Sequence, residues 1–419
     1  MNTIIRNALL SGREGLWDIE MKEGKFARIE QGIPDKADTE YDAKGKLVTP
    51  TFVDPHIHLD KVLISEVVRP NVSGTLSEAI EIIWDKKCDY TIDDVVERAS
   101  RAIEMSVSHG TTHLVSHVDI DPICGLKALE GVMEAARRMS DIAEIRLVAF
   151  PQEGIIQSQG TRELMIEAMR MGCHRVGGMP YNEMTYDDSK EHIDFCFKLA
   201  KDFDADIDMH VDETDDPNAQ TLQYLAAKTI REDYQGRVTA GHTCALSSYN
   251  DYYAARIIDL VAKAKINMIT NPATNLMLEG RLDGYPTRRG LTRVKQLMDA
   301  GVNVAFGQDC IKDTFYPTFG QGDLLEVGML LCHAAQFSMP DEVEKVFGMM
   351  TENAAKIYGL EPFGIMEGNW ACCNILDVTT VQEAFRTRAP RLYVFKTGRL
   401  VARSRQESEI IRHPAVVKS

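Results

Sequence analysis

The sequence predicts an α/β protein: a (β/α)8 barrel of the TIM type, with a small β-sandwich module built from both chain termini. In the central part of the chain, short β-branched, apolar runs alternate with longer segments that carry apolar residues at helical spacing. At both ends, short apolar stretches are separated by glycine-containing turns. The length of 419 residues and the hydrophobic content of 44% suit one barrel-sized domain with a smaller module.

The terminal module is expected from residues 1–49 together with residues 365–419. Short strands are predicted at Ile4-Ile5, Trp17–Met21, Phe26–Ile29, Lys46–Val48, Ala371–Val378, Arg391–Lys396 and Arg399–Arg403. Lys396-Thr397-Gly398-Arg399 predicts a hairpin turn between the last two. Because neither end has enough strands for a stable sheet alone, we expect them to pair.

The barrel is expected over residues 50–364. Its eight predicted strands are Thr51–Ile57, Thr112–Asp119, Ile145–Phe150, Arg175–Met179, Ala205–His210, Arg237–His242, Ile266–Asn271 and Val302–Gln308. Helices are predicted between them, at Glu130–Met139, Glu163–Met171, Glu191–Asp202, Ala219–Arg231 and Leu291–Ala300. A doubly wound open sheet is the alternative, but no glycine-rich dinucleotide fingerprint follows any strand.

Composition argues against several classes of partner. The 47 Lys and Arg against 63 Asp and Glu give a formal charge of −16, which opposes binding to nucleic acid or to an anionic membrane surface. The nine cysteines are scattered and never form a C-x-x-C pair, which indicates a reducing compartment. Since no apolar run reaches the length of a signal-peptide core or a membrane span, we expect a cytoplasmic protein.

Polar side chains at strand ends indicate where the chemistry lies. In a barrel, the carboxyl ends of the strands share one mouth, so these residues form a set. His56 and His58 end the first strand on one face, and two imidazoles on one face can bind a metal ion, although the pair alone could equally be buried core histidines. His210 ends the fifth strand, and Glu213 follows in the loop, where a carboxylate suits a base beside bound water.

Two further strand ends complete the set. His242 ends strand six, and Asp309 follows strand eight. Three imidazoles and one carboxylate suit one divalent ion, with zinc, ferrous iron and manganese all compatible with these ligand types. The fourth strand offers no lysine to bridge a second ion. His109, His113 and His117 cluster around the second strand, where we expect them to serve structure rather than ligation.

The motifs resemble those of the amidohydrolase superfamily, and within it the cytosine deaminase group, along essentially the whole chain. The supporting stretches are Phe52 to Lys61, Val148 to Gly154, Met209 to Glu213, Arg237 to Thr243, Ser248 to Asn250, Asn271-Pro272 with Gly280-Arg281, Tyr285 to Val294 and Gly307 to Pro317. The resemblance implies that the metal is bound by His56, His58, His210 and Asp309. It further implies that Glu213 shuttles protons, that His242 and Asp309 assist the hydrolytic water, and that Gln152 hydrogen-bonds the amide edge of a pyrimidine.

Two departures from the group bear on the substrate. The best-known bacterial cytosine deaminases have a second aspartate where this chain has Cys310, and a tryptophan where it has Phe315. A methyl group is buried at less cost beside a thiol than beside an ionised carboxylate. We therefore predict a hydrolytic deaminase of a free aminopyrimidine base, cytosine and also 5-methylcytosine. The H-x-E…P-C-x-x-C signature of deaminases that act on flipped nucleotides is absent from the sequence.

The sequence leaves two other functions open. The same site could hydrolyse another aminated heterocycle, such as isoguanine, isocytosine, creatinine or an N-alkylamino triazine. A noncatalytic barrel scaffold is the remote alternative, and such a protein would not need its metal ligands. We expect a homo-oligomer whose ligand is a small nucleobase.

Overall fold

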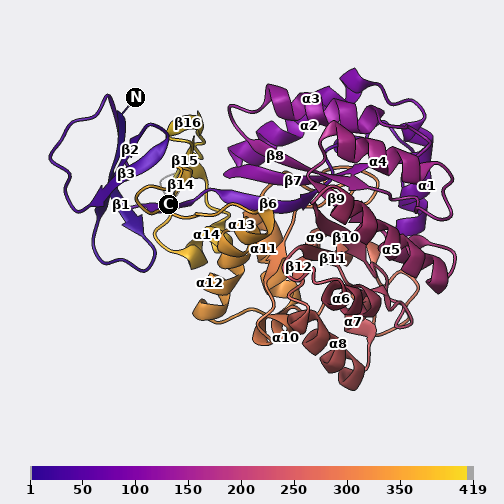
Figure 1. Cartoon of the computed structure of the whole chain (residues 1–419). Coiled ribbons are helices and arrows are strands. Elements are labelled where there is room, and N and C mark those ends of the chain that lie inside the picture. Colours follow the sequence, from indigo (N-terminus) through magenta and orange to yellow (C-terminus); the bar gives the residue numbers. More distant parts are fainter. Residues whose placement is uncertain (1, 413–419) are drawn as a thin grey trace, which may run out of the picture.

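The central sheet consists of eight parallel strands in sequence order. In the computed structural model, which describes residues 2–412, they are β6 (Phe52–Ile57), β7 (Thr111–Asp119), β8 (Glu144–Phe150), β9 (Arg175–Gly178), β10 (Asp206–Val211), β11 (Val238–His242), β12 (Asn267–Thr270) and β13 (Val304–Phe306). A parallel bridge between Ile57 and Asp309 brings the first and last strands together. The predicted barrel is confirmed (Figure 1).

Helices follow and surround the strands. They are α1 (Leu76–Lys87), α2 (Ile92–Ser108), α3 (Lys127–Arg138), α4 (Thr161–Met171), η1 (Pro180–Asn182), α5 (Tyr186–Asp202), α6 (Thr221–Arg231), α7 (Ala245–Ser248), α8 (Asp251–Lys263), α9 (Pro272–Leu278), α10 (Val294–Asp299), α11 (Leu324–Ala334), α12 (Pro340–Met349), α13 (Glu352–Tyr358) and α14 (Val381–Thr387). Three of the longer helices start at a threonine cap, Thr75, Thr91 and Thr185, whose hydroxyl accepts from a backbone N–H of the first turn.

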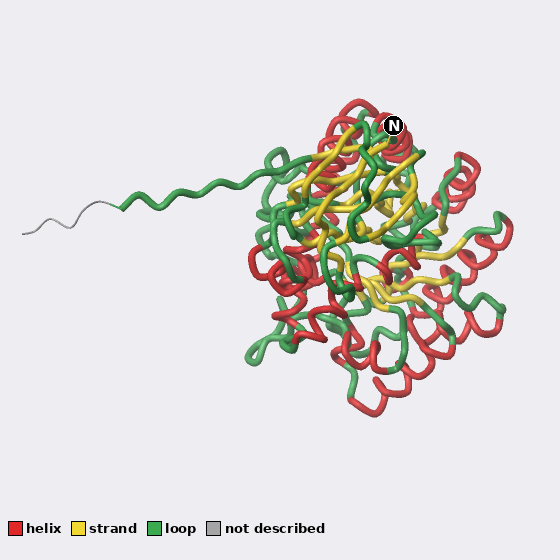
Figure 2. The backbone as a smooth tube through the Cα atoms, turned by 90° about the vertical axis from the view of Figure 1, so that its left-hand side faces the viewer, coloured by secondary structure: helices red, strands yellow, loops and turns green. Residues whose placement is uncertain are grey.

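A second sheet is built from both ends of the chain, as predicted. Its strands are β1 (Asn2–Leu10), β2 (Trp17–Lys22), β3 (Lys25–Glu30), β4 (Thr39–Asp42), β5 (Leu47–Pro50), β14 (Cys373–Leu376), β15 (Arg391–Lys396) and β16 (Arg399–Ala402). β1 pairs with β2, β4 and β5, and β5 pairs antiparallel with β14, which joins the two termini. In Figure 2 the molecule is turned so that this module faces the viewer. Residues 413–419 of the predicted module lie outside the described part.

One end of the barrel is closed by α13. The side chains of Ala354, Ile357 and Tyr358 form one buried cluster with residues of the strands, among them Val53 and Val148. This packing fills the barrel at one end with apolar groups. The open end, at the carboxyl ends of the strands, is therefore left for polar side chains.

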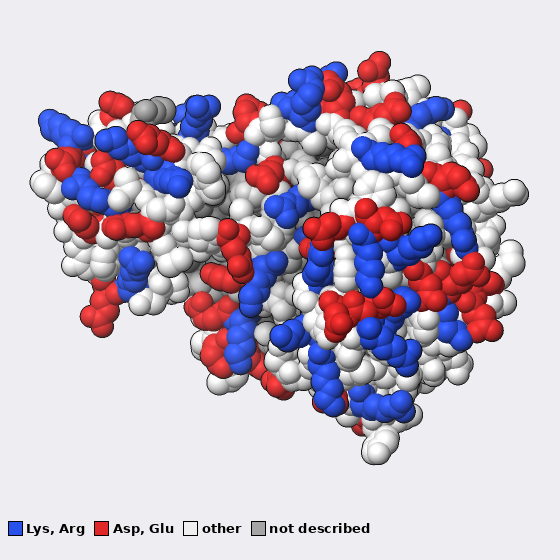
Figure 3. Space-filling view, in the orientation of Figure 1, with Lys and Arg blue, Asp and Glu red and all other residues white. Residues whose placement is uncertain are grey.

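The surface carries charges of both signs. Figure 3 shows acidic and basic side chains interspersed over the visible face. Among the described residues, no helix combines the length and the apolar character that crossing a bilayer requires.

Candidate active site

Closure of the barrel places Asp309 between His56, in β6, and His58, which directly follows that strand. The Asp309 N–H donates to the carbonyl of His56 at 2.8 Å, and the His58 N–H donates to the carbonyl of Asp309 at 3.0 Å. Gly307 permits this approach, because a Cβ there would lie 2.6 Å from the His56 carbonyl oxygen. Asp309 itself has a left-handed φ of 63°, as does His242 at 66°. Non-glycine residues adopt this conformation at a cost, and they cluster at functional sites.

The four predicted metal ligands converge at this point. His56, His58, His210 and Asp309 each offer one ligand atom, and these atoms lie within 4.8 Å of one another. His58 Nε2 is 3.1 Å from His210 Nε2, and the Asp309 carboxylate is 3.5 Å from His56 Nε2 and 3.4 Å from His58 Nε2. Asp309 Oδ2 and both ring nitrogens of His56 are buried without a hydrogen-bond partner in the described structure. A divalent cation would supply the missing partner, so the residues fit such an ion.

The electrostatics of the cluster suit the same ion. Burial, and then the charge of His117, lowers the pKa of His56 to about 3. Burial also lowers the pKa of His58 and His210 well below the ordinary histidine value, with Lys61 and His242 as the next contributors. Neutral imidazoles have a free lone pair, which is the form that binds a metal. The site therefore offers three neutral nitrogen donors and one carboxylate.

A second group of polar side chains lies beside these ligands. His242 Nδ1 is 3.0 Å from Glu213 Oε1, and the side-chain amide of Asn275 donates to Glu213 Oε1 at 3.2 Å and lies 3.1 Å from His242 Nδ1. Burial opposes charge on His242, but the Glu213 carboxylate outweighs it and raises the pKa of His242. Glu213 thus has a fixed neighbour that can share a proton with it.

His117 supports the ligand cluster from the interior of the barrel. Its ring packs against His56 with centroids 4.1 Å apart, and its Nε2 lies 3.3 Å from Asp208. Asp208 in turn accepts from Arg175 at 2.9 Å. His113 instead packs against Tyr358, the α13 residue that helps close the far end of the barrel.

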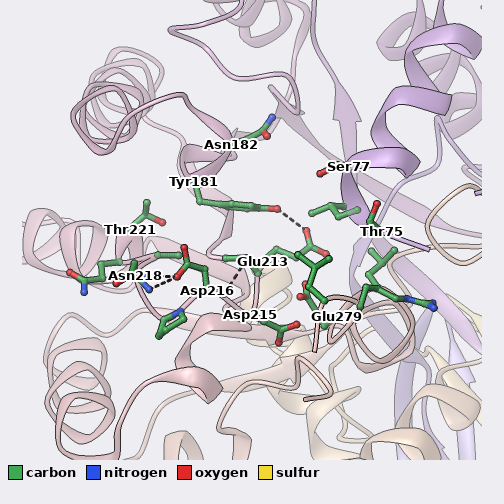
Figure 4. A pocket seen from close by; sticks show the side chains of 18 of the residues that line it. Thr75, Ser77, Tyr181, Asn182, Glu213, Asp215, Asp216, Asn218, Thr221 and Glu279 are labelled. Atoms are coloured by element: carbon green, nitrogen blue, oxygen red, sulfur yellow. Dashed lines mark hydrogen bonds between the residues drawn. The ribbon is translucent and has the colours of Figure 1, made fainter. Parts of the chain in front are cut away.

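The predicted substrate residues share one cavity with the ligands. The inner cavity is lined by His58, Lys61, Leu76, Phe150, Gln152, Met179, His210, Glu213, His242, Thr274, Asp309, Cys310 and Phe315. Its volume of about 20 Å³ holds one water molecule, so a ring-sized ligand requires side chains of this wall to move. An outer cavity of about 670 Å³ shares Leu76 and Glu213 with it. Figure 4 shows Glu213, Asp215 and Glu279 in the wall of this outer cavity, with the Tyr181 hydroxyl directed at Glu213.

Sequence reasoning missed a buried polar network behind the inner cavity. Lys87 is fully buried, and its ammonium lies 2.5 Å from Asp119, 2.8 Å from Asp121 and 2.8 Å from Glu153. The three carboxylates have the spacing of a metal site, but the lysine occupies the position of the cation. No sequence signal marks Lys87, because it ends an amphipathic helix where lysines are ordinarily exposed. Lys61 belongs to the conspicuous HLDK stretch and could have been found there.

Comparisons with known proteins agree with this geometry. A family model, described as the amidohydrolase family, matches residues 69–402. The structure of 5-methylcytosine deaminase from Klebsiella pneumoniae, liganded with 5-fluorocytosine, is 37% identical with a TM-score of 0.92, over 98% of this chain and 100% of that chain.

Two relatives with other names match most of the chain. N-isopropylammelide isopropyl amidohydrolase of Pseudomonas sp. (strain ADP) is 30% identical over 406 residues, 96% of this chain and 97% of that protein. Pterin deaminase of Rhizobium rhizogenes (strain K84 / ATCC BAA-868) is 30% identical over 367 residues, 87% of this chain and 82% of that protein. The resemblance inferred from the motifs is thereby confirmed.

Proposed function

We propose, from the premise that this chain belongs to the amidohydrolase family, that it deaminates free cytosine and 5-methylcytosine to uracil or thymine and ammonia. Its relatives establish the coarser class, a hydrolase of carbon–nitrogen bonds. One observation carries the finer proposal. Gln152, Cys310 and Phe315 line the same cavity as Glu213 and the candidate metal ligands. The 5-methylcytosine deaminase, with which the chain shares its fold over nearly its full length, supports it.

The proposed cofactor is one divalent ion, zinc or ferrous iron, with manganese as the third option. His56, His58, His210 and Asp309 would hold it. When bound, such an ion lowers the pKa of a water molecule and so supplies the nucleophile.

The side chains around the cavity handle the protons. Glu213 delivers a proton to the ring nitrogen next to the amino-bearing carbon, which makes that carbon electrophilic. His242 and Asn275, both in contact with Glu213, hold its carboxylate in place. That first proton comes from the water molecule, whose oxygen then adds to the carbon; Glu213 next takes the proton of the new hydroxyl group and passes it to the amino nitrogen. The carbon–nitrogen bond then breaks, and ammonia leaves while the ring keeps the oxygen of water.

Cys310 is proposed to admit the 5-methyl group. It is 2% exposed, and burial, followed by the charge of Asp309, raises the pKa of its thiol well above the ordinary value. The side chain is therefore an uncharged, small neighbour for a methyl group. Replacing it by a carboxylate, Cys310→Asp, should lower kcat/KM for 5-methylcytosine relative to cytosine by about tenfold or more. Wild-type enzyme that is at least about a hundredfold slower on 5-methylcytosine than on cytosine would contradict this role, since that loss is roughly 3 kcal/mol of transition-state binding.

An ammonia-release screen tests the function as a whole. Metal-loaded enzyme would be assayed with cytosine, 5-methylcytosine, isocytosine, isoguanine and creatinine. We expect release from the first two. Release from another ring, with none from cytosine or 5-methylcytosine, would refute the proposal.

The second candidate function is hydrolysis of an N-alkylamino triazine. The full-length similarity to N-isopropylammelide isopropyl amidohydrolase favours it. A separate assay of isopropylamine release from N-isopropylammelide distinguishes it from cytosine deamination.

We further propose a cytoplasmic homo-oligomer. All nine cysteines are free thiols, as a reducing compartment would keep them. Light scattering of the purified chain measures its oligomeric state.

A further inference from the structure

Lys61 is a buried cation in the wall of the inner cavity. It is 1% exposed and follows the metal-ligand strand β6 by a few residues. Its ammonium donates to Asp119 Oδ1 and to Gln152 Oε1, both at 2.7 Å. The ammonium also lies over the rings of Phe150 and Phe315, at 5.3 and 5.6 Å from their centroids. Of these neighbours, Gln152, Phe150 and Phe315 line the inner cavity together with Lys61.

These contacts fix the orientation of the Gln152 side-chain amide. A lysine ammonium can only donate, so the amide atom that faces Lys61 must be the carbonyl oxygen. At the other end, Gln152 Nε2 donates to Glu153 Oε1 at 3.3 Å, and a carboxylate can only accept. The backbone is held too, because Asn182 donates to the Gln152 carbonyl at 2.8 Å. One N–H of the Gln152 amide therefore remains for a ligand in the cavity.

Lys61 keeps its charge in this position. Burial opposes the ammonium form, but the carboxylates of Asp119 and Asp60 outweigh burial and raise the pKa of Lys61. An ammonium has three N–H donors, and within residues 2–412 only Asp119 and Gln152 accept from this one. One donor of Lys61 is thus also available to a ligand.

We propose, resting on the proposed function, that Lys61 is a positioning and specificity residue that makes the inner cavity select rings with an oxo group. It holds Gln152 with an amide N–H available to that oxygen and adds its own free N–H. Both groups donate, and neither can accept. Cytosine has an oxo group between its two ring nitrogens, whereas 4-aminopyrimidine is the same ring without it. A buried donor left without its acceptor is costly, so the cavity should reject the second ring.

Lys87 provides a matched control. It is also a fully buried lysine and also contacts Asp119, but its other partners are Asp121 and Glu153, and it does not line the inner cavity. Loss of Lys87 perturbs the same network without removing a donor from the cavity. The two lysines thus separate a general loss of structure from a loss of selectivity.

The test compares kcat/KM for cytosine and for 4-aminopyrimidine in zinc-loaded, full-length enzyme. The wild type should prefer cytosine by roughly a hundredfold or more, and Lys61→Met should reduce that preference by about tenfold to a hundredfold, mainly through a higher KM for cytosine. Lys61→Arg should retain part of the preference because it keeps the charge. Lys87→Met should lower the melting temperature and leave the preference within about twofold of the wild type.

Further outcomes separate the role of Lys61 from the proposed deamination of cytosine. If Lys61→Met does not fold, Gln152→Glu tests whether the amide N–H that Lys61 orients selects the oxo group. The carboxylate of this variant still binds the lysine but has no N–H for the oxo group. A preference that survives in Lys61→Met overturns the role of Lys61, and a preference that survives in Gln152→Glu overturns the part of that role that acts through the Gln152 amide. Wild-type enzyme that accepts both rings equally also overturns that role and leaves cytosine deamination intact. An enzyme that is inactive on both rings refutes the proposed function itself, and with it the role of Lys61.

Discussion

Glu279, at the end of α9, allows a quantitative test of the electrostatics around the outer cavity. It is 8% exposed, and burial, followed by the nearby carboxylates of Glu213 and Asp215, raises its pKa from the ordinary 4.5 to about 9. The folded protein therefore binds the proton of Glu279 more tightly than the unfolded chain does. The stability that this proton contributes is complete below pH 4.5 and is lost as the pH rises from 4.5 to about 9.

The substitution Glu279→Gln removes this loss. At pH 7 the pH is about 2.5 units above the pKa of the unfolded chain. At roughly 1.36 kcal/mol per unit, the folded wild type has lost about 3 kcal/mol of stability. Glutamine stays neutral and can still donate to Asp215, so the variant should be more stable by about that amount. For a chain of 419 residues, the usual unfolding entropy of about 2.1 cal/mol/K per residue converts this to a melting temperature about 3 to 4 °C higher.

Scanning calorimetry of wild type and variant between about pH 5 and about pH 9 measures the effect. The difference in melting temperature should be small at the acid end and should grow steadily with pH. Glu163→Gln, at an exposed glutamate of α4, is the control for the substitution itself. A difference that does not change with pH, or a variant less stable than wild type at pH 7, would show that Glu279 is not buried beside like charges.

Three further predictions concern the site and its support. Glu213→Gln should reduce ammonia release from cytosine by about 10²- to 10⁴-fold while the bound metal, measured by mass spectrometry, stays at one ion per chain; unchanged turnover would remove Glu213 from the proton transfer. Asp309→Asn removes the only anionic ligand of the cluster, so its metal content after dialysis against chelator should fall to near zero. Retained metal would contradict the ligand assignment. Lys87→Met leaves the buried carboxylates of Asp121 and Glu153 without their cation, while Asp119 keeps Lys61, and should cost about 3 to 5 kcal/mol in urea unfolding. A cost below about 1 kcal/mol would mean that water replaces the lysine.

The repeating pattern of the chain was readable from the sequence because its causes are local. Alternation within the first strand puts His56 and His58 on one face, and apolar residues at helical spacing indicate the helices between the strands. The eight strands found by this reasoning are the eight of the barrel, and both terminal segments pair as expected. Barrel geometry then sends the strand-end residues to one mouth, which is why His210 and Asp309 could be grouped with them.

The tertiary structure decided which side chains meet across the barrel. Lys61 and Gln152 are separated by 91 residues, and Lys87 and Glu153 by 66, so no local pattern relates them. The first pair joins the segments that follow β6 and β8, and the second pair joins the end of α1 to the segment after β8. The sequence by itself predicted the ligand set, and its resemblance to a known family gave the class of reaction, hydrolysis of a carbon–nitrogen bond. Which groups are left as free donors toward a ligand follows from three-dimensional contacts, because hydrogen-bond satisfaction is a property of the packed interior.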